Sequence, residues 1–492
     1  MRTIAAALIG LLALLAVALL ANTYRKGSSQ IAAQAAAPLR IDANAAAEHL
    51  AGAIRFRTVS FEDESKSPGD ELRKLQRYLE QTYPHAHAAL KREQVGGFSL
   101  LYTWPGADPD SAPILLMAHQ DVVPIAPGTE KDWQADPFAG TIRDGFIWGR
   151  GAWDDKGNLI SILEAAEMLA REGFQPRRTI YFAFGHDEEL GGEHGAQRIA
   201  ELLQSRGVKL AFVLDEGLLI TDGVLRGLGK RAALIGIAEK GYLNLALSAT
   251  AGGGHSSMPA PRSAIGALSS ALARLEKDPM PAGIHGVAAQ TLETLAPEMH
   301  GVNRVVLSNL WLFAPLVAAQ FEKSPSTNAM LRTTTALTVV QAGNKANVIP
   351  GRAEAIVNFR LLPGDSAEAV IAHVKHTIGD EGVKVERTPG AFAEPSRVSA
   401  TDSDAYRQLA LTIREVFPDT LVAPGLMLGA TDSRHMAALS DEIFRFSPVV
   451  AKPEDLARFH GTNERISLDN FTAMIAFYHR LLLNTAGPAR QP

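Results

Sequence analysis

Three short apolar runs, each followed at once by acids or a histidine, constrain the fold of this chain most strongly. They read APILLMA at 112–118, RTIYFAF at 178–184 and LAFVL at 210–214, and turn residues bound each of them. Such runs are typical of strands buried on both faces of a parallel sheet. Between the first two, GNLISILEAAEMLAREG at 157–173 has helical spacing and a glycine near its end. This order predicts a doubly wound α/β fold.

The pattern changes near residue 241, where GYLNLALSATAG alternates like a half-exposed strand. A helix pattern follows, and then two strand patterns, a second helix pattern and a last strand pattern. The order βα, then ββαβ, predicts an α+β, ferredoxin-like lid or dimerisation domain inserted at 241–395. The catalytic domain would then consist of 41–240 and 396–492. The insert also holds an extra stretch at 280–333 that contains SNLWLFAPLVAAQF. Core or interface packing, an acyl-binding wall and a membrane-contacting surface remain open for it.

The N-terminus is of a different kind. From Ile4 to Ala21 the chain reads IAAALIGLLALLAVALLA, without a charged or strongly polar side chain. A helix of this length nearly crosses the hydrocarbon core of a bilayer. We therefore predict that 1–21 is a signal peptide or a membrane anchor and that 22–40 is a linker. The catalytic domain is expected to be exported, either into the periplasm or extracellular space or onto the membrane.

Composition excludes several classes of function. The chain of 492 residues has no cysteine, so disulfides, thiolate zinc sites and a cysteine nucleophile are excluded. Its formal net charge is −5 at pH 7, which does not favour nucleic acid as a partner. Any transition-metal site must therefore be built from histidines and carboxylates.

Acids and a histidine follow the predicted strands, and another acidic pair lies in the turn WGRGAWDDKGNL. In an open α/β sheet, ligands bind beyond the carboxyl ends of the strands, so we expect these groups to converge. The residues are His119, Asp121, Asp154, Glu188, Glu189 and Asp215.

A cluster of carboxylates is unfavourable unless cations neutralise it. Histidine and carboxylate ligands suit zinc, with manganese or cobalt as substitutes. A carboxylate shared by two ions makes a two-metal centre, and Asp154 is our candidate for that bridge. For Asp154 alone, a helix N-cap is the competing interpretation. Asp155 is expected to support the turn.

Seven motifs together resemble one enzyme family. They are MAHQDVVP, WGRGAWDDKGN, GHDEELGG, LDEG, GGGHSSMPAP, NVIPGRAEAIVNFRLLPG and FHGTNERIS. In this order they resemble the dizinc metallopeptidases of the family of carboxypeptidase S, aminoacylases, carnosinase and succinyl-diaminopimelate desuccinylase. The resemblance covers roughly residues 50–480. It is greatest to the carboxypeptidase S branch, which includes N-fatty-acyl amino acid synthase/hydrolases.

The resemblance implies two Zn²⁺ ions per chain and a role for each candidate. His119 and Asp215 would bind one ion, Glu189 and His460 the other, and Asp154 both. Glu188 would be the general base, which takes the proton of the attacking water. Asp121 would orient the imidazole of His119.

Three further residues are candidates outside this cluster. The resemblance implies that His255, in the inserted domain, stabilises the developing oxyanion, in some relatives across a homodimer. Asn347 is a weaker candidate for substrate contact. Arg434 offers a two-point hydrogen bond to a substrate carboxylate, with a surface ion pair as its alternative.

The leading hypothesis is a hydrolase that cleaves an amide bond beside a free carboxylate, as a carboxypeptidase or an N-acyl amino acid amidohydrolase. Its substrate would be a small peptide or an N-acyl amino acid. A dipeptidase-type metallopeptidase is the alternative within the family. A catalytically silent binding module and a membrane-anchored solute-binding protein are the alternatives outside it. Neither of these accounts as well for the complete set of carboxylates.

Overall fold

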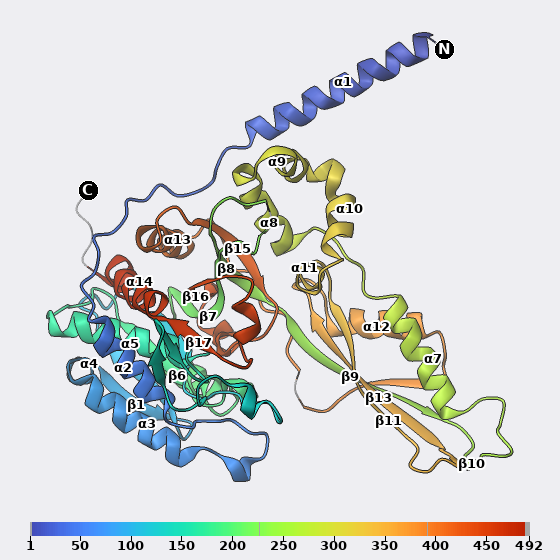
Figure 1. The fold of residues 1–492 in the computed structure, drawn as a ribbon, viewed down its shortest axis with the longest axis horizontal. Helices are drawn as coiled ribbons and strands as arrows, with labels where there is room; N and C mark the ends of the chain where they lie inside the picture. The colour runs from blue at the N-terminus through green and yellow to red at the C-terminus, as the bar shows by residue number, and fades with distance from the viewer. Residues whose placement is uncertain (1, 226, 391, 488–492) are drawn as a thin grey trace.

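The computed structural model describes residues 2–225, 227–390 and 392–487 and contains an eight-stranded mixed sheet (Figure 1). The first residue of the predicted N-terminal segment and residues 488–492 of the predicted second catalytic part lie outside these ranges. In spatial order the strands are β1 (Lys91–Val95), β2 (Ser99–Trp104), β6 (Ile180–Gly185), β3 (Ile114–His119), β7 (Phe212–Thr221), β16 (Ile443–Ala451), β8 (Ala232–Glu239) and β15 (Leu421–Met427).

The three apolar runs of the sequence form the adjacent strands β6, β3 and β7. β3 pairs in parallel with both of its neighbours, and β7 pairs in parallel with β16. The carboxyl ends of these strands therefore lie at one edge of the sheet. The α/β fold class is confirmed.

One side of the sheet is antiparallel, which the apolar runs did not predict. β1 and β2 form a hairpin, and β2 runs antiparallel to β6. Gly96 and Gly97 in the connecting turn have φ angles of 59° and 101°. Glycine adopts such left-handed conformations without a steric penalty, and the chain reverses here within a few residues.

Helices cover both faces of this sheet. Side chains alternate along each strand, so both faces carry apolar side chains that need to be covered. Leu116 on β3 belongs to one core, and its neighbour Leu115 belongs to another. The helices on the first face are α2 (Ala43–Ile54), α3 (Gly69–Thr82), α4 (Pro84–Ala89), α5 (Lys156–Arg171), α13 (Asp404–Val416) and α14 (Leu468–Ala486). The second face is covered by α6 (Ala196–Ser205). α5 is the helix expected between the first two apolar runs.

A second, four-stranded antiparallel sheet lies apart from the first (Figure 1). Its order is β11 (Thr334–Ala342), β13 (Arg352–Leu361), β9 (Gly241–Thr250) and β14 (Val383–Arg387). Two helices, α7 (Ala264–Lys277) and α12 (Ala367–Ile378), share its apolar core. These elements lie within the stretch for which a lid domain is predicted, and the boundaries of that domain stay a prediction.

Two small sheets complete the strands. β10 (Gly254–His255) pairs with β12 (Val348–Ile349), and β4 (Thr141–Arg143), β5 (Phe146–Trp148) and β17 (Arg465–Ser467) form a three-stranded sheet. β5 and β17 lead into and out of the loops that carry Asp154 and His460. Their antiparallel pairing brings these two loops together.

The helix α1 (Arg2–Arg25) projects from the remainder of the molecule (Figure 1). Among the described residues it is the single helix long and apolar enough to cross a membrane. The stretch 280–333 is helical: α8 (Gly286–Leu295), α9 (Gly301–Ser308), α10 (Leu310–Phe321) and α11 (Pro325–Leu331). Part of it packs on β15 and β8 through Leu421 and Ala232. α9 lies at the base of α1.

Candidate metal centre

His119 ends β3 with its ring fully buried. Its Nδ1 lies 2.9 Å from the main-chain oxygen and 3.3 Å from the Oδ1 of Asp121. Asp121 is itself fixed by the Ser60 hydroxyl, which donates over 2.6 Å, and by the N–H groups of Glu188 and Glu189. Burial alone would raise the pKa of Asp121, but the hydrogen bond and charge of His119 and the hydrogen bond from Ser60 together lower this pKa. Asp121 thus orients the ring so that Nε2 faces the remaining acids.

Asp154 lies between two imidazoles. Its Oδ1 is 3.0 Å from the Nε2 of His119, and its Oδ2 is 2.6 Å from the Nε2 of His460. Burial would raise the pKa of Asp154, and the two histidines lower it well below its usual range. Each carboxylate oxygen therefore faces a different histidine, which is the arrangement that a bridging ligand needs.

Asp155 supports the turn, as its position before α5 indicated. One of its oxygens accepts a hydrogen bond from the backbone N–H of His119 over 3.2 Å. The other accepts one from Asn158 over 2.5 Å. Its carboxylate makes no capping bond to α5. Asp155 is therefore directed toward β3 and not toward His460.

A buried ion pair holds the loops of Asp154 and His460 together. Glu464 accepts hydrogen bonds from the backbone N–H groups of Gly151, Trp153 and Asp154 over 3.0, 2.9 and 3.1 Å. Arg150 donates to Glu464 over 2.5 Å and to the carbonyl oxygen of His460 over 3.1 Å. Sequence reasoning missed both members of this pair, although Glu464 stands in the quoted motif FHGTNERIS.

Glu188 and Glu189 follow β6 in a short 3₁₀ turn. The Oε1 of Glu189 lies 3.5 Å from the Nε2 of His460 and has no hydrogen-bond partner although it is buried. The Oε2 of Glu188 lies 4.0 Å from the Nε2 of His119. Burial raises the pKa of Glu188 well above its usual range, and the charge of Glu216 adds to this against the opposing effect of His119.

The two acids of the motif LDEG, Asp215 and Glu216, contact different partners. Asp215 accepts hydrogen bonds from the backbone N–H groups of Glu216 and Ser433 over 2.9 and 2.8 Å. The Oε1 of Glu216, by contrast, lies 3.4 Å from the Nε2 of His119. Burial, and then the charge of Asp154, raise the pKa of Glu216 to about 8. The structure thus places Glu216 beside His119, and Asp215 as a metal ligand stays a prediction.

The donor atoms fit divalent cations. Three groups of side chains have ligand atoms that lie within 4.8 Å of one another. They are His119, Asp154 and Glu216; His119, Glu188 and Glu189; and Asp154, Glu189 and His460. The first and third groups share only Asp154. Imidazole and carboxylate donors suit zinc, and positive charge would relieve the repulsion between the buried carboxylates.

His255 and Asn347 lie together but away from this cluster. β10, which contains His255, is at the far end of the second sheet (Figure 1). The backbone oxygen of Asn347 accepts a hydrogen bond from Ser256 over 3.1 Å, and both predicted residues are exposed. The Nδ1 of His255 lies 2.8 Å from the hydroxyl of Ser257. Within one chain these two residues do not reach the metal centre.

Arg434 lies beside the metal-centre loops and near a second cation. It donates to the carbonyl oxygen of Gly191 over 2.5 Å. Arg360, on β13, stacks over Tyr242 with its guanidinium 4.8 Å from the ring centroid. Burial lowers the pKa of Arg360, and the charge of Arg434 adds to this effect. Within the described ranges, neither arginine has an ion pair with a carboxylate. Arg360 was missed from the sequence, although it stands in the motif NFRLLPG.

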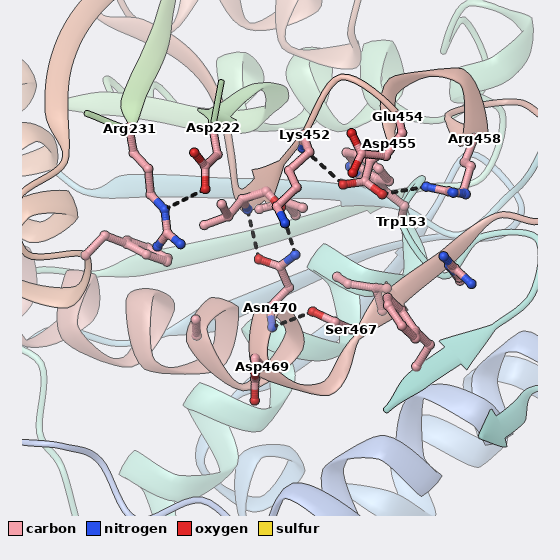
Figure 2. A pocket seen from close by; sticks show the side chains of 17 residues that line it. Trp153, Asp222, Arg231, Lys452, Glu454, Asp455, Arg458, Ser467, Asp469 and Asn470 are labelled. Carbon is pink, nitrogen blue, oxygen red and sulfur yellow. Dashed lines mark hydrogen bonds and ion pairs between the residues drawn. The ribbon is translucent and has the colours of Figure 1, made fainter. Parts of the chain in front are cut away.

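A separate cavity of about 550 Å³ lies beside Trp153 (Figure 2). Trp153 lines it, but none of the candidate residues named above does. Four of its charged groups form two ion pairs: Arg231 with Asp222 over 3.2 Å, and Arg458 with Asp455 over 2.5 Å. Figure 2 shows these pairs as dashed lines on its wall. The cavity is therefore not the metal centre.

Comparison with known proteins gives concordant results. The sequence profile of peptidase family M20/M25/M40 matches residues 115–484. The chain is 45% identical over 442 residues to N-fatty-acyl-amino acid synthase/hydrolase PM20D1 of Xenopus tropicalis, with 89% of this chain and 85% of that protein covered. It is 42% identical over 488 residues to probable carboxypeptidase S-like 2 of Dictyostelium discoideum, with 97% and 92% covered.

A solved structure shares the fold at low sequence identity. The M20 family metallo-carboxypeptidase Sso-CP2 of Sulfolobus solfataricus superposes with a TM-score of 0.66 at 18% identity. The match covers 91% of this chain and 99% of that chain. It extends over both the eight-stranded and the four-stranded sheet regions, because so little of either chain is left out.

Proposed function

The chain belongs to peptidase family M20/M25/M40 and is a metal-dependent amide hydrolase, and from this premise we propose that it hydrolyses N-acyl amino acids at two divalent cations. The observation that carries the proposal is the position of Asp154 between His119 and His460. We propose His119, Asp154 and Glu216 as ligands of one cation. Asp154, Glu189 and His460 are then the ligands of the other. Glu216 takes the place that the sequence resemblance gave to Asp215.

Zinc is the proposed metal, with manganese or cobalt as substitutes, because the site offers only nitrogen and oxygen donors. When bound, the cations supply Lewis acidity to the amide carbonyl and to the attacking water. Asp215 is proposed to position Glu216, because its carboxylate accepts hydrogen bonds from the backbone N–H groups of Glu216 and Ser433. Arg150 and Glu464 are likewise proposed to position His460 and Asp154 through hydrogen bonds to their backbones.

Glu188 is the proposed general base. It is partly buried beside the cluster, and among the described residues its carboxylate has no hydrogen-bond partner and lies 4.0 Å from the Nε2 of His119. Burial and neighbouring carboxylates raise its pKa, which increases its ability to hold a proton taken from water. Glu188 then passes this proton to the leaving nitrogen. Asp121 keeps the ring of His119 in place during both steps.

A free carboxylate on the substrate is the proposed recognition element. Arg434 and Arg360 bring two positive charges to the same region without a carboxylate partner among the described residues. A guanidinium binds a carboxylate by two parallel hydrogen bonds. The names of the two relatives point to N-fatty-acyl amino acids and to peptide C-termini as substrates. A dipeptidase-type activity is the alternative.

His255 and Asn347 are proposed to act in the active site of a second copy of the chain. Both are exposed at the tip of the four-stranded sheet, away from the metal centre of their own chain. The edge strand β11 is also exposed, with Val340 60% accessible. An exposed apolar edge strand is a template for pairing with another chain. A homodimer that covers this edge would allow His255 to reach the partner's site and to stabilise the oxyanion.

Export is proposed for the catalytic part of the molecule. The apolar helix α1 is near the N-terminus, and its membrane-length window is not buried in the fold. Both a signal peptide and an anchor have this composition. A reporter fused after residue 40 tests export: reporter activity outside the cytoplasm supports it, and purely cytosolic activity contradicts it.

One assay tests the hydrolase. The chain, purified without chelator, is analysed for metal and assayed with N-acyl-Phe and N-acyl-Leu of short and long acyl chains, and with Gly-Leu and Ala-Asp. We expect two divalent ions per chain and a higher kcat/KM for the N-acyl amino acids. Preference for the free-amine dipeptides would favour the dipeptidase alternative. Full metal content without hydrolysis of any substrate would favour a silent binding module.

A further inference from the structure

The helix α10 is apolar on all sides, yet only one side is covered by protein. Phe313, Val317 and Phe321 pack against the core that includes β8 and β15. On the opposite side, Trp311 is 66% exposed and Leu316 is 64% exposed. A helix that is hydrophobic all round requires an apolar environment all round. Within the described ranges no segment of this chain provides it.

The uncovered side continues onto α9 and toward α1. Val302 on α9 is 76% exposed, and the axes of α9 and α10 bend by 114° at their junction. Asn309 occupies this junction, fully buried. The bent pair lies at the base of the projecting α1 (Figure 1). The exposed apolar side chains of the bent pair therefore lie close to a helix that is long enough to cross a bilayer.

Polar side chains join α1 specifically to this junction. The side-chain amide of Asn309 donates to the Thr23 hydroxyl over 3.0 Å and to the Leu19 carbonyl oxygen over 3.2 Å. The amide of Asn22 donates to the Asn309 side-chain oxygen over 3.0 Å and to the Ser308 carbonyl oxygen over 2.9 Å. Buried polar groups need such partners. Cleavage after residue 21 would remove Leu19 and the helical turns that position Asn22 and Thr23, so the joint favours a retained helix over a cleaved signal peptide.

The residues around the joint are those that favour a membrane–water interface. Tyr24, which follows the apolar part of α1, lies under the guanidinium of Arg304 at 5.9 Å. The indole N–H of Trp311 donates to Asn309 over 3.2 Å. Arg25 ends α1. Tyrosine and tryptophan concentrate at the headgroup level, and arginine binds the anionic lipid surface. The end of α1, the rings of Tyr24 and Trp311 and the α9–α10 bend thus lie next to one another.

We propose that α1 is retained as a membrane anchor and that the α9–α10 bend lies in the adjoining bilayer interface, with Trp311, Leu312 and Leu316 among the lipid acyl chains. The molecule then contacts the membrane at two connected places, and the joint fixes how its catalytic part is oriented over the bilayer. This inference rests on the proposed export and is independent of the proposed hydrolase activity. Its tests therefore use no turnover measurement.

Fluorescent labelling tests the lipid contact in the full chain. Because the protein has no cysteine, Leu316→Cys introduces a single labelling site. Ile265→Cys is the matched control, since Ile265 is an exposed apolar residue on α7, outside the α9–α10 surface. Each variant is labelled with bimane and reconstituted into phosphatidylcholine–phosphatidylglycerol vesicles with or without lipid that carries a nitroxide on its acyl chain.

We expect nitroxide lipid to reduce the emission at position 316 at least two-fold and to leave position 265 unchanged. Equal emission with and without nitroxide at position 316 would overturn the proposal. If the emission at 316 is also blue-shifted in that case, a second copy of the chain covers the surface instead of lipid. Quenching at both positions would show non-specific adsorption and would likewise overturn it.

The joint has a separate test. The intact mass of the full chain recovered from membranes should include residues 2–21 of α1. A mass that begins after residue 21 overturns the retention of this helix. In addition, Thr23→Val removes a hydroxyl partner of Asn309 and preserves side-chain shape. Hydrogen exchange of the backbone at 301–312 should become about ten-fold faster in this variant, because the buried amide loses a partner. Ser28→Ala, in the exposed segment after α1, is the control. Unchanged exchange in Thr23→Val would show that the joint does not hold α1.

Discussion

The two sheets differ in how their candidate functional residues are supported. Around the eight-stranded sheet, His119 and Asp154 are buried and each has several polar neighbours from distant parts of the chain. At the tip of the four-stranded sheet, His255 and Asn347 are exposed, and the hydrogen bonds described for them lie within and between the loops of β10 and β12. A buried cluster of charges keeps its geometry within one chain, whereas an exposed histidine acquires a defined position only against another surface. The buried cluster is thus assembled within one chain, whereas the role proposed for His255 requires a second copy of the chain.

The largest effects are expected in the buried cluster. Glu188→Gln should lower kcat by about 10³- to 10⁴-fold, since a positioned general base contributes up to this range. Its metal content should remain, because Glu188 is not among the proposed ligands. Asp154→Ala should lose both activity and metal, because neither cation keeps its shared ligand. Elemental analysis beside the kinetics distinguishes the two variants. Near-normal turnover in Glu188→Gln would mean that another residue is the base.

Replacement of His255 should have a smaller effect that appears in kcat and not in KM. We expect His255→Ala to lower kcat by about 10²- to 10³-fold, as loss of an oxyanion donor does. A mixture of His255→Ala and Glu188→Gln chains should regain activity, because a mixed dimer contains one site with an intact base and an intact histidine. Failure of the mixture to exceed its components, although mixed dimers form, would place the action of His255 within its own chain.

A change at the exposed edge of β11 should affect the protein only through formation of the proposed homodimer. Val340→Lys places a charge on the exposed edge and should shift the chain toward monomer by at least ten-fold in dissociation constant, since edge lysines oppose strand pairing. Sedimentation at several concentrations measures this change. Metal content should be unaffected. A dimer of unchanged stability would move the proposed interface to another face.

The smallest effect concerns the connection between the sheets. Lys240 lies between β8 and β9 and donates to the carbonyl oxygens of Ala329 and Arg332 over 3.0 and 2.8 Å. Burial lowers its pKa to about 7. In the unfolded chain the lysine binds its proton up to a much higher pH, so its contribution to stability increases as the pH rises above 7.

Between pH 7 and 9 this gain should be about 2 kcal/mol. Chemical denaturation across that range measures it, with Lys240→Met as the comparison. The slope of stability against pH should be smaller in Lys240→Met by this amount. Equal slopes would show that Lys240 is protonated in the folded chain throughout the range.

Much of the fold followed from local patterns in the sequence. The apolar runs at 112–118, 178–184 and 210–214 became adjacent parallel strands because continuous apolar segments tolerate burial on both faces. The hairpin of β1 and β2 did not follow, since KREQV at 91–95 is polar and is held in the sheet by pairing with its neighbour. Tertiary pairing determined that strand.

The candidate site shows a similar limit. Clustered acids at strand ends indicated where the site lies, but the sequence analysis named Asp215 and did not indicate that Glu216 also lies beside His119. Strand alternation turns adjacent side chains to opposite faces, and an irregularity in the pairing of β7 with β16 follows Asp215. Such an irregularity changes which residue faces the site, and it depends on contacts with a distant strand. The roles of Arg150 and Glu464 were hidden for the same reason, since they meet across 314 positions.

The ion pair of Arg150 and Glu464 also affects how late in synthesis the metal centre can form. Asp154 leaves the ribosome 310 positions before Glu464 does. Contacts this far apart in sequence form late and slowly, after the intervening loop entropy has been overcome. A chain truncated before residue 460 therefore lacks the proposed ligand His460 and the ion pair that holds the loop of Asp154. We therefore expect no hydrolysis from a nascent chain before Glu464 has emerged and joined the loop of Asp154.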